Sequence, residues 1–300
     1  MQIVTLGAAA GGGFPQWNSN GPGCRRARAG DAAAPARTQA SLAVSGDGER
    51  WYVLNAAPDL RQQIERTPEL HPRAAPRHSP IAGVILTGGD VDVIAGLLTL
   101  RERQPLAVHA TARVHDILDA NPIFEVLARG IVARPAELLD VPFALEGGLT
   151  ATLFAVPGKA PLYMEEGEGM QPIVTDGTTV GLEIGDGRVR MAFIPGCAAF
   201  SPALAERLDG TDLVLFDGTL WQDDEMIVAG AGSKSGLRMG HMSLDGPEGT
   251  IAAFRGIEVR RKVVIHMNNT NPVLLADSPE RAAAEAAGWQ IGYDGMRISL

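Results

Sequence analysis

Two carboxylates that follow a short apolar run are the first candidates for chemistry in this sequence. Asp90 and Asp92 come directly after the run Gly83–Thr87, where a strand would give way to a helix. Two carboxylates so placed can converge on one cation, because an apolar surface would not tolerate them unpaired. Asp is also favoured near a helix N-terminus, so helix capping is the alternative interpretation.

Two histidines lie at the ends of later runs. His266 closes the apolar run Lys262–Ile265 and opens into an Asn-rich segment, and His241 follows a glycine. Imidazole is the commonest protein ligand for transition metals. With Asp90 or Asp92, the two histidines would match the two-His, one-carboxylate set of non-haem Fe(II) oxygenases. Spacing alone does not establish that these side chains converge.

The two cysteines carry little chemical signal. Cys197 follows a predicted strand and is interpreted as packing, because buried free cysteine is usually inert. Cys24 has no Cys or His at ligand spacing, so no zinc knuckle is predicted there. Two cysteines so far apart indicate no disulfide framework and favour a reducing compartment.

A glycine-rich segment, Gly7–Gly13, follows the first apolar run. A dinucleotide-binding loop would continue into a helix, and Phe14–Asn18 is no helix start, so that function is excluded. Both a tight structural turn and a close approach of backbone to a ligand remain open.

The elements that would position these residues are mostly strands. Apolar or β-branched runs that end in turn-forming residues predict strands at Ile3–Leu6, Ser41–Val44, Trp51–Leu54, Gly83–Thr87, Leu106–His109, Leu149–Val156, Thr179–Ile184, Arg188–Ile194, Leu213–Phe216 and Lys262–His266. Glycine-rich turns predict two hairpins, at Ser41–Leu54 and Val180–Phe193. Antiparallel groups of strands with helices between them predict an α/β fold with two helix-covered sheets.

Helices are predicted at Asp59–Arg66, Ile94–Glu102 and from Ser278 to Gly288. No linker divides the chain, so a single domain over residues 1–300 is expected. Long loops are predicted at three places, each either a surface insertion or a lid over a site: Asn18–Arg37, Met164–Gly177 and Gln222–Gly240.

Composition narrows the class of protein. The chain has 300 residues, 45% hydrophobic and 20% charged, which is typical of a folded globular protein. A net charge of −9 argues against a general nucleic-acid binder and favours small-molecule ligands. No secretion signal and no run of about 20 apolar residues is found, so we expect a cytoplasmic protein without membrane insertion.

An ordered set of short motifs resembles the metallo-β-lactamase superfamily and, within it, the family of pyrroloquinoline quinone (PQQ) biosynthesis B proteins. The motifs are Gly7–Asn18, Arg37–Gln39, Leu54–Asp59, Leu97–Glu102, Val156–Lys159, Ile194–Cys197, Leu215–Thr219 and His266–Pro272. The resemblance implies an αββα sandwich with its site at one edge of the two sheets. It also implies either iron-dependent hydroxylation of a tyrosine-derived Glu-Tyr precursor or, as the alternative, a non-catalytic carrier of PQQ or its precursor.

The chain departs from the superfamily's hydrolases at their metal ligands. Their His-x-His-x-Asp-His stretch aligns with a segment that places Val93 at its end, and Lys159 and Cys197 replace a His and an Asp. A dinuclear zinc site needs those side chains, so lactamase-type hydrolysis is not expected. The PQQ family usually has a His at Val93 and three cysteines near Ser19–Cys24, so we expect no structural zinc.

What the resemblance implies for the site is one metal ion. Asp92, His241 and His266 would hold Fe(II), Asp90 would be a fourth ligand or a neighbouring catalytic group, and Lys159 would anchor a substrate carboxylate. Further substrate contacts are expected from Arg37, Asp217 and Asn269. The expected partner is a small molecule, the Glu-Tyr precursor or PQQ, and a homo-oligomer remains open. The carrier alternative depends on Val93, which cannot bind a metal.

Overall fold

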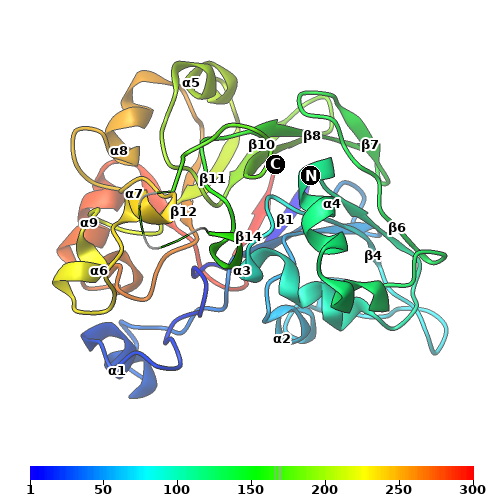
Figure 1. Ribbon diagram of the computed structural model, residues 1–300, viewed down its shortest axis with the longest axis horizontal. Helices are drawn as coiled ribbons and strands as arrows, with labels where there is room; N and C mark the ends of the chain where they lie inside the picture. Colours follow the sequence, from blue (N-terminus) through cyan, green and yellow to red (C-terminus); the bar gives the residue numbers. More distant parts are fainter. Residues whose placement is uncertain (166, 168, 170) are drawn as a thin grey trace.

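In the described part of the chain, two seven-stranded sheets pack face to face in a computed structural model (Figure 1). The structure describes residues 1–165, 167, 169 and 171–300. The first sheet has the order β14-β1-β2-β3-β4-β5-β6, with β14 Arg297–Ser299, β1 Gln2–Gly7, β2 Ser41–Ser45, β3 Trp51–Leu54, β4 Ile81–Ile85, β5 Leu106–His109 and β6 Val132–Ala133. The second has the order β13-β12-β11-β10-β9-β8-β7, with β13 Trp289–Ile291, β12 Lys262–Ile265, β11 Leu213–Asp217, β10 Arg190–Ile194, β9 Val180–Gly185, β8 Leu149–Ala155 and β7 Phe143–Leu145.

Helices cover the outer faces of both sheets (Figure 1). Their bounds are α1 Pro22–Arg28, α2 Leu60–Glu65, α3 Val91–Ile94, α4 Ala112–Asp119, α5 Pro202–Leu208, α6 Glu225–Val228, α7 Gly236–Met239, α8 Thr250–Ala253 and α9 Pro279–Ala286. Helices α2 and α4 pack on the first sheet, and α5 and α9 on the second. This arrangement confirms the predicted α/β class and αββα sandwich.

The apolar core follows the two-residue period of the strands. In β3, Trp51 and Val53 pack against the outer helices, whereas Tyr52 and Leu54 face the second sheet. Successive side chains of a strand point to opposite faces, so a strand that is buried on both faces is apolar throughout.

Strand direction differs in part from the prediction. The two predicted hairpins are confirmed as the antiparallel pairs β2–β3 and β9–β10. The runs β3 to β6 and β10 to β13 are parallel, so the prediction of antiparallel groups was wrong for them. The carboxyl ends of parallel strands meet at one edge of a sheet, and that edge is where ligands bind in such folds.

The helix predicted at Ile94–Glu102 starts earlier and changes type. The α-helix spans Val91–Ile94, and a 3₁₀ helix follows at Ala95–Leu100. The cause lies at Gly96, whose backbone N–H donates to the carbonyl of Ala56 at 2.8 Å instead of continuing the α-helical pattern. A Cβ at this glycine would lie 2.0 Å from the Ala57 carbonyl oxygen, so the close approach requires glycine.

Two of the three predicted long loops contain helices. Helix α1 lies within Asn18–Arg37, and α6 and α7 lie within Gln222–Gly240. Local residues explain the starts of α1 and α7. Pro22 is the first residue of α1, and the Ser235 hydroxyl caps α7 by accepting from the backbone N–H of Arg238. The third loop, Met164–Gly177, includes residues 166, 168 and 170, which lie outside the described residues. Over the residues described, no helix is both long and apolar enough to cross a membrane.

Candidate metal centre

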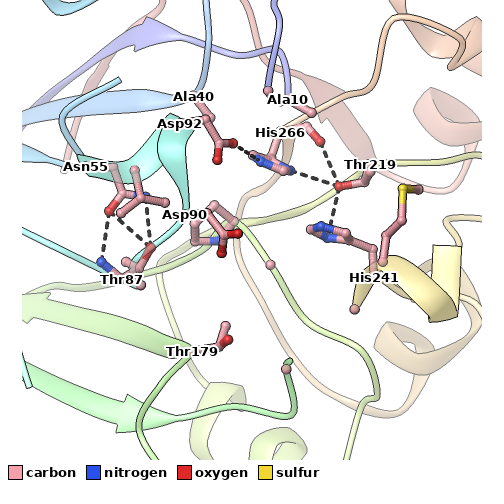
Figure 2. A pocket seen from close by; sticks show the side chains of 18 of the residues that line it. Ala10, Ala40, Asn55, Thr87, Asp90, Asp92, Thr179, Thr219, His241 and His266 are labelled. Carbon is pink, nitrogen blue, oxygen red and sulfur yellow. Dashed lines mark hydrogen bonds and ion pairs between the residues drawn. The ribbon is translucent and has the colours of Figure 1, made fainter. Parts of the chain in front are cut away.

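A cavity of about 230 Å³ opens where strand ends of both sheets meet (Figure 2). Its polar lining comes from segments far apart in the sequence: Asn55, Thr87, Asp90, Asp92, Lys159, Thr179, Thr219, His241, His266 and Asn268. The carboxylates follow β4, and His266 follows β12, as the sequence predicts. The cavity therefore brings together the expected ligands Asp92, His241 and His266.

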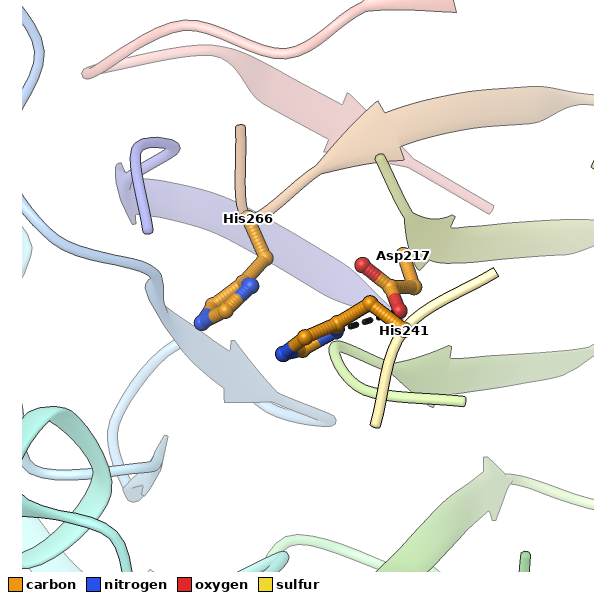
Figure 3. Close-up of side chains that lie close together, drawn as sticks. All are labelled: Asp217, His241 and His266. Carbon is orange, nitrogen blue, oxygen red and sulfur yellow. Dashed lines mark hydrogen bonds and ion pairs between the residues drawn. The ribbon is translucent and has the colours of Figure 1, made fainter. Parts of the chain in front are cut away.

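Two imidazole rings form one wall of this cavity (Figure 3). The rings of His241 and His266 stack with their centroids 5.2 Å apart. His241 Nδ1 lies 2.7 Å from Asp217 Oδ2, and His266 Nδ1 lies 2.9 Å from the Thr219 hydroxyl. That hydroxyl donates to Asp217 Oδ1 at 2.7 Å, so it accepts from His266. The Asp217 carboxylate can only accept, so His241 carries a proton on Nδ1, and His266 does so as the donor to Thr219. The Nε2 atoms of both rings therefore point away from Asp217 and Thr219.

Backbone geometry also fixes His266. Its φ is 59°, in the left-handed region that a residue other than glycine rarely adopts. Such a conformation persists only when the surrounding structure holds it, and it concentrates at functional sites.

Asp92 faces the outer edge of the His266 ring. The distance from Asp92 Oδ2 to His266 Nε2 is 2.8 Å. Burial disfavours the charged form of Asp92, but the hydrogen bond and charge of His266 outweigh it and lower the pKa of Asp92. Burial likewise opposes protonation of His266, and the hydrogen bond and charge of Asp92 outweigh it and raise the pKa of His266. The two form an ion pair when no cation separates them.

In protein stripped of metal, Asp92→Asn is expected to lower the free energy of unfolding by about 1–3 kcal/mol near a pH of about 6. Because the pKa of His266 is raised, its protonation stabilises the folded protein. This contribution is complete below pH 6.5, the ordinary pKa of histidine, and is lost as pH rises through the raised pKa. Because the pKa of Asp92 is lowered, its ionisation also stabilises the folded protein. This contribution is complete above pH 3.8, the ordinary pKa of aspartate, and is lost as pH falls through the lowered pKa. The deficit of the variant should therefore shrink as pH rises through the raised pKa of His266. Urea unfolding across this range measures it, and a deficit that does not change with pH would contradict the ion pair.

Asp90 lies beside this pair, at the N-terminus of α3. It occupies the N-cap position and Asp92 lies in the first turn, as the capping alternative expects, but the Asp90 side chain makes no capping hydrogen bond. Burial, and then the charge of Asp92, raise the pKa of Asp90, while Lys159 lowers it by a smaller amount. A carboxylate that holds its proton more tightly is suited to proton transfer.

The donor set fits one metal ion. In Figure 2, Asp92 lies beside His266, and Asp90 faces His241 across the cavity. Ligating histidines characteristically bond a carboxylate or a hydroxyl through their other nitrogen, as both rings do here. Among the described residues, the one group of three His, Cys, Asp or Glu donor atoms within 4.8 Å is Asp217, His241 and His266, so Asp92 approaches His266 but lies outside that group.

Asp217 is better placed to orient the rings than to bind an ion or a substrate. Its side chain is fully buried, and it accepts from the backbone of Cys197, from the backbone and hydroxyl of Thr219, and from His241. All of its acceptor positions are therefore used. The expectation that it contacts substrate does not agree with this geometry.

Two other expected substrate contacts lie outside the cavity. The Arg37 guanidinium donates to the carbonyls of Pro35 and Ala36, because its segment turns back onto the N-terminal loop. The Asn269 amide donates to Gln16 at 2.5 Å and belongs to a separate cavity of about 750 Å³.

The cysteines and the glycine-rich segment also have defined places. Cys197 is buried, and burial raises the pKa of its thiol to about 12, in agreement with an inert packing role. The Cys24 thiol faces the Asn269 amide oxygen at 3.6 Å. Gly11 lines the cavity, where a Cβ would lie 3.6 Å from the Asp92 carboxylate, so this turn also approaches the site.

Several residues of the site were not predicted. Thr219 follows Asp217 by two positions, and a polar residue just past a strand end is a signal that could have found it. Glu165 carries no comparable signal. It binds the expected anchor Lys159, with its Oε1 2.7 Å from Nζ.

Comparison with known proteins agrees with this geometry. Residues 50–267 match the model of the beta-lactamase superfamily domain. The chain is 62% identical to coenzyme PQQ synthesis protein B of Gluconacetobacter diazotrophicus, with 100% of this chain and 99% of that one covered. It is 53% identical to the protein of the same name from Xanthomonas oryzae pv. oryzae over the full length of both.

Solved structures give the same result. A Zn(2+)-bound PqqB from Methylobacterium extorquens superposes with a TM-score of 0.97 at 50% identity over the whole of both chains. A diphosphatase of the PhnP family, 18% identical, shares the fold with a TM-score of 0.71, 99% of this chain and 96% of that chain being covered. The chain therefore belongs to the coenzyme PQQ synthesis protein B family, within the β-lactamase superfamily.

Proposed function

We propose that this protein catalyses a metal-dependent hydroxylation of a tyrosine-derived Glu-Tyr precursor during PQQ biosynthesis. One observation carries the proposal: His241 and His266 are both held through Nδ1, so that their Nε2 atoms turn toward a cavity that Asp92 also lines. Two imidazoles and a carboxylate with open positions beside them suit a non-haem Fe(II) oxygenase. Asp92, His241 and His266 would hold the ion.

The bound metal would supply activation of O₂. The same nitrogen and oxygen donors also bind zinc. The relative from Methylobacterium extorquens binds zinc, so zinc is a second candidate metal, and both iron and zinc are tested.

The protein's own residues would orient the substrate and move its proton. Asp90, whose pKa is raised, would accept the phenol proton. Lys159 lines the cavity and would attract a carboxylate of the precursor. Hydroxylation puts one oxygen atom of O₂ on the ring and releases the other as water, so a two-electron reductant such as ascorbate belongs in the reaction.

The proposal predicts about one iron per chain and oxygen uptake with L-glutamyl-L-tyrosine and ascorbate. The measurements are metal analysis after anaerobic loading with Fe(II) or Zn(II), and an oxygen electrode. The carrier alternative predicts tight PQQ binding by metal-free protein and no oxygen uptake. An absence of oxygen uptake by the iron-loaded protein would refute the hydroxylase.

A matched pair of variants sharpens this experiment. Val93 lines the cavity, whereas Val91 on the same helix is 57% exposed. Val93→His adds a donor beside Asp92 and is expected to tighten Fe(II) binding about tenfold, or ~1.4 kcal/mol. Val91→His should change nothing. Equal effects of the two substitutions would mean that no ion is held at this cavity.

A further inference from the structure

One carboxylate beside the metal centre is surrounded by three cations. Glu165 has a side chain only 5% exposed, and it lies 2.7 Å from Lys159, 3.1 Å from Lys234 and 2.8 Å from Arg238. The hydrogen bond from Arg238, followed by those from the two lysines, lowers the pKa of Glu165 to about 2. The carboxylate is therefore charged throughout the physiological range.

The cations adjoin the metal centre directly. Lys159 lines the cavity, and Arg238 lies on α7, three residues before His241. On the other side, the Tyr163 hydroxyl donates to the Gly89 carbonyl at 2.6 Å, next to Asp90. A carboxylate bound by these cations thus lies at the border of the cavity.

We propose that Lys159, Lys234 and Arg238 form a carboxylate-binding subsite for the substrate, and that Glu165 occupies it as an internal substitute until a substrate carboxylate displaces it. The substrate class, a polycarboxylate, rests on the proposed function above.

Two features distinguish Glu165 from a structural ion pair. Three cations, rather than two, supply charge-assisted donors to its one carboxylate, as proteins do for bound carboxylates. It also follows a short 3₁₀ turn, Leu162–Met164, whose three side chains are exposed. A turn with few buried contacts opens at low cost.

Glu183 provides the contrast. It also bridges two cations, Arg190 and Arg207, at 3.3 and 2.6 Å. It belongs to the interior of β9, between β8 and β10, so its backbone cannot move away from these partners without breaking the sheet. Glu183→Gln is the matched control.

The test is calorimetric titration of full-length protein with benzene-1,3,5-tricarboxylate, PQQ and L-glutamyl-L-tyrosine. Metal is first removed with phenanthroline, a chelator without carboxylates, so that no ligand binds through the ion. Glu165→Gln is expected to tighten binding of the tricarboxylate about tenfold, because a neutral amide competes less well for charged donors. The gain should shrink in high salt. Glu183→Gln should bind as the native protein does, and Lys234→Met should bind more weakly.

The outcomes separate this subsite from the proposed function. Tighter tricarboxylate binding without tighter binding of PQQ or the dipeptide supports the subsite and contradicts the proposed substrate. Tricarboxylate binding that is equal in the native protein and Glu165→Gln overturns the subsite and leaves the proposed function standing. If Glu165→Gln does not fold, a crystal structure of the native protein with the tricarboxylate decides: a ligand carboxylate on Arg238 supports displacement, and Glu165 still on its cations overturns it.

Discussion

Replacing His266 by alanine is expected to abolish metal retention and to lower any turnover by more than about 100-fold. The His266 side chain connects Asp92, which follows the first sheet's β4, with Thr219, which follows the second sheet's β11. Its Nε2 faces Asp92 at 2.8 Å and its Nδ1 faces Thr219 at 2.9 Å. Its removal leaves the half-buried Asp92 without its partner and takes away one of the two imidazoles that line the cavity. Metal content, affinity by competition with a chromophoric chelator, and oxygen uptake are the measurements.

His109→Ala is the matched control. His109 is also a buried histidine bonded to a carboxylate, with its Nδ1 2.8 Å from Glu137, and it does not line the cavity. Its loss should cost stability without changing metal affinity. Wild-type metal affinity in His266→Ala would place the ion elsewhere in the protein.

The sequence predicts this site well where function depends on strand ends. Asp90, Asp92 and His266 come just past apolar runs, β4 in one sheet and β12 in the other, and the cavity lies where these strand ends of the two sheets meet. The order of these strands in the sheets does not follow from composition. The resemblance to a family implied the sandwich, which the structure confirms, but not the order of the strands.

Side-chain direction after a strand end is what the sequence could not give. Asn268 lines the cavity while its neighbour Asn269 faces Gln16, because the chain leaves β12 through the left-handed conformation of His266. Asp217 is the last residue of β11, and its carboxylate lies behind the rings. A difference of one residue decides which side chain meets the cavity.

Contacts between distant segments were equally out of reach. Glu165 meets Arg238 across 73 positions, and both lie in regions that the sequence marks only as loops. Charged residues in loops are usually solvated, so their pattern does not indicate a buried cluster. The change of helix type at Gly96 could not be predicted for a similar reason, since the hydrogen bond from Gly96 to Ala56 depends on how the helix packs beside the end of β3.

Asp217→Asn is expected to weaken metal binding about 10- to 100-fold although Asp217 need not touch the ion. The carboxylate accepts from Nδ1–H of His241, and this bond keeps the Nε2 lone pair turned toward the cavity. The asparagine amide presents a donor at one of the two oxygen positions. Where that donor meets His241, the ring must take its other tautomer, with the proton on Nε2, and it then cannot bind a metal.

The predicted change in the tautomer of His241 can be measured separately from a loss of stability. Nitrogen-15 chemical shifts of the histidine rings report the tautomer of His241 directly in metal-free protein. Asp294→Asn is the control, because Asp294 is a half-buried carboxylate that accepts from the backbone and hydroxyl of Thr38 at 2.7 and 2.8 Å, and it does not line the cavity. Both variants should lose about 1–3 kcal/mol of stability. Only Asp217→Asn should shift the tautomer and the metal affinity together, and a shift in neither would show that His241 is oriented by packing alone.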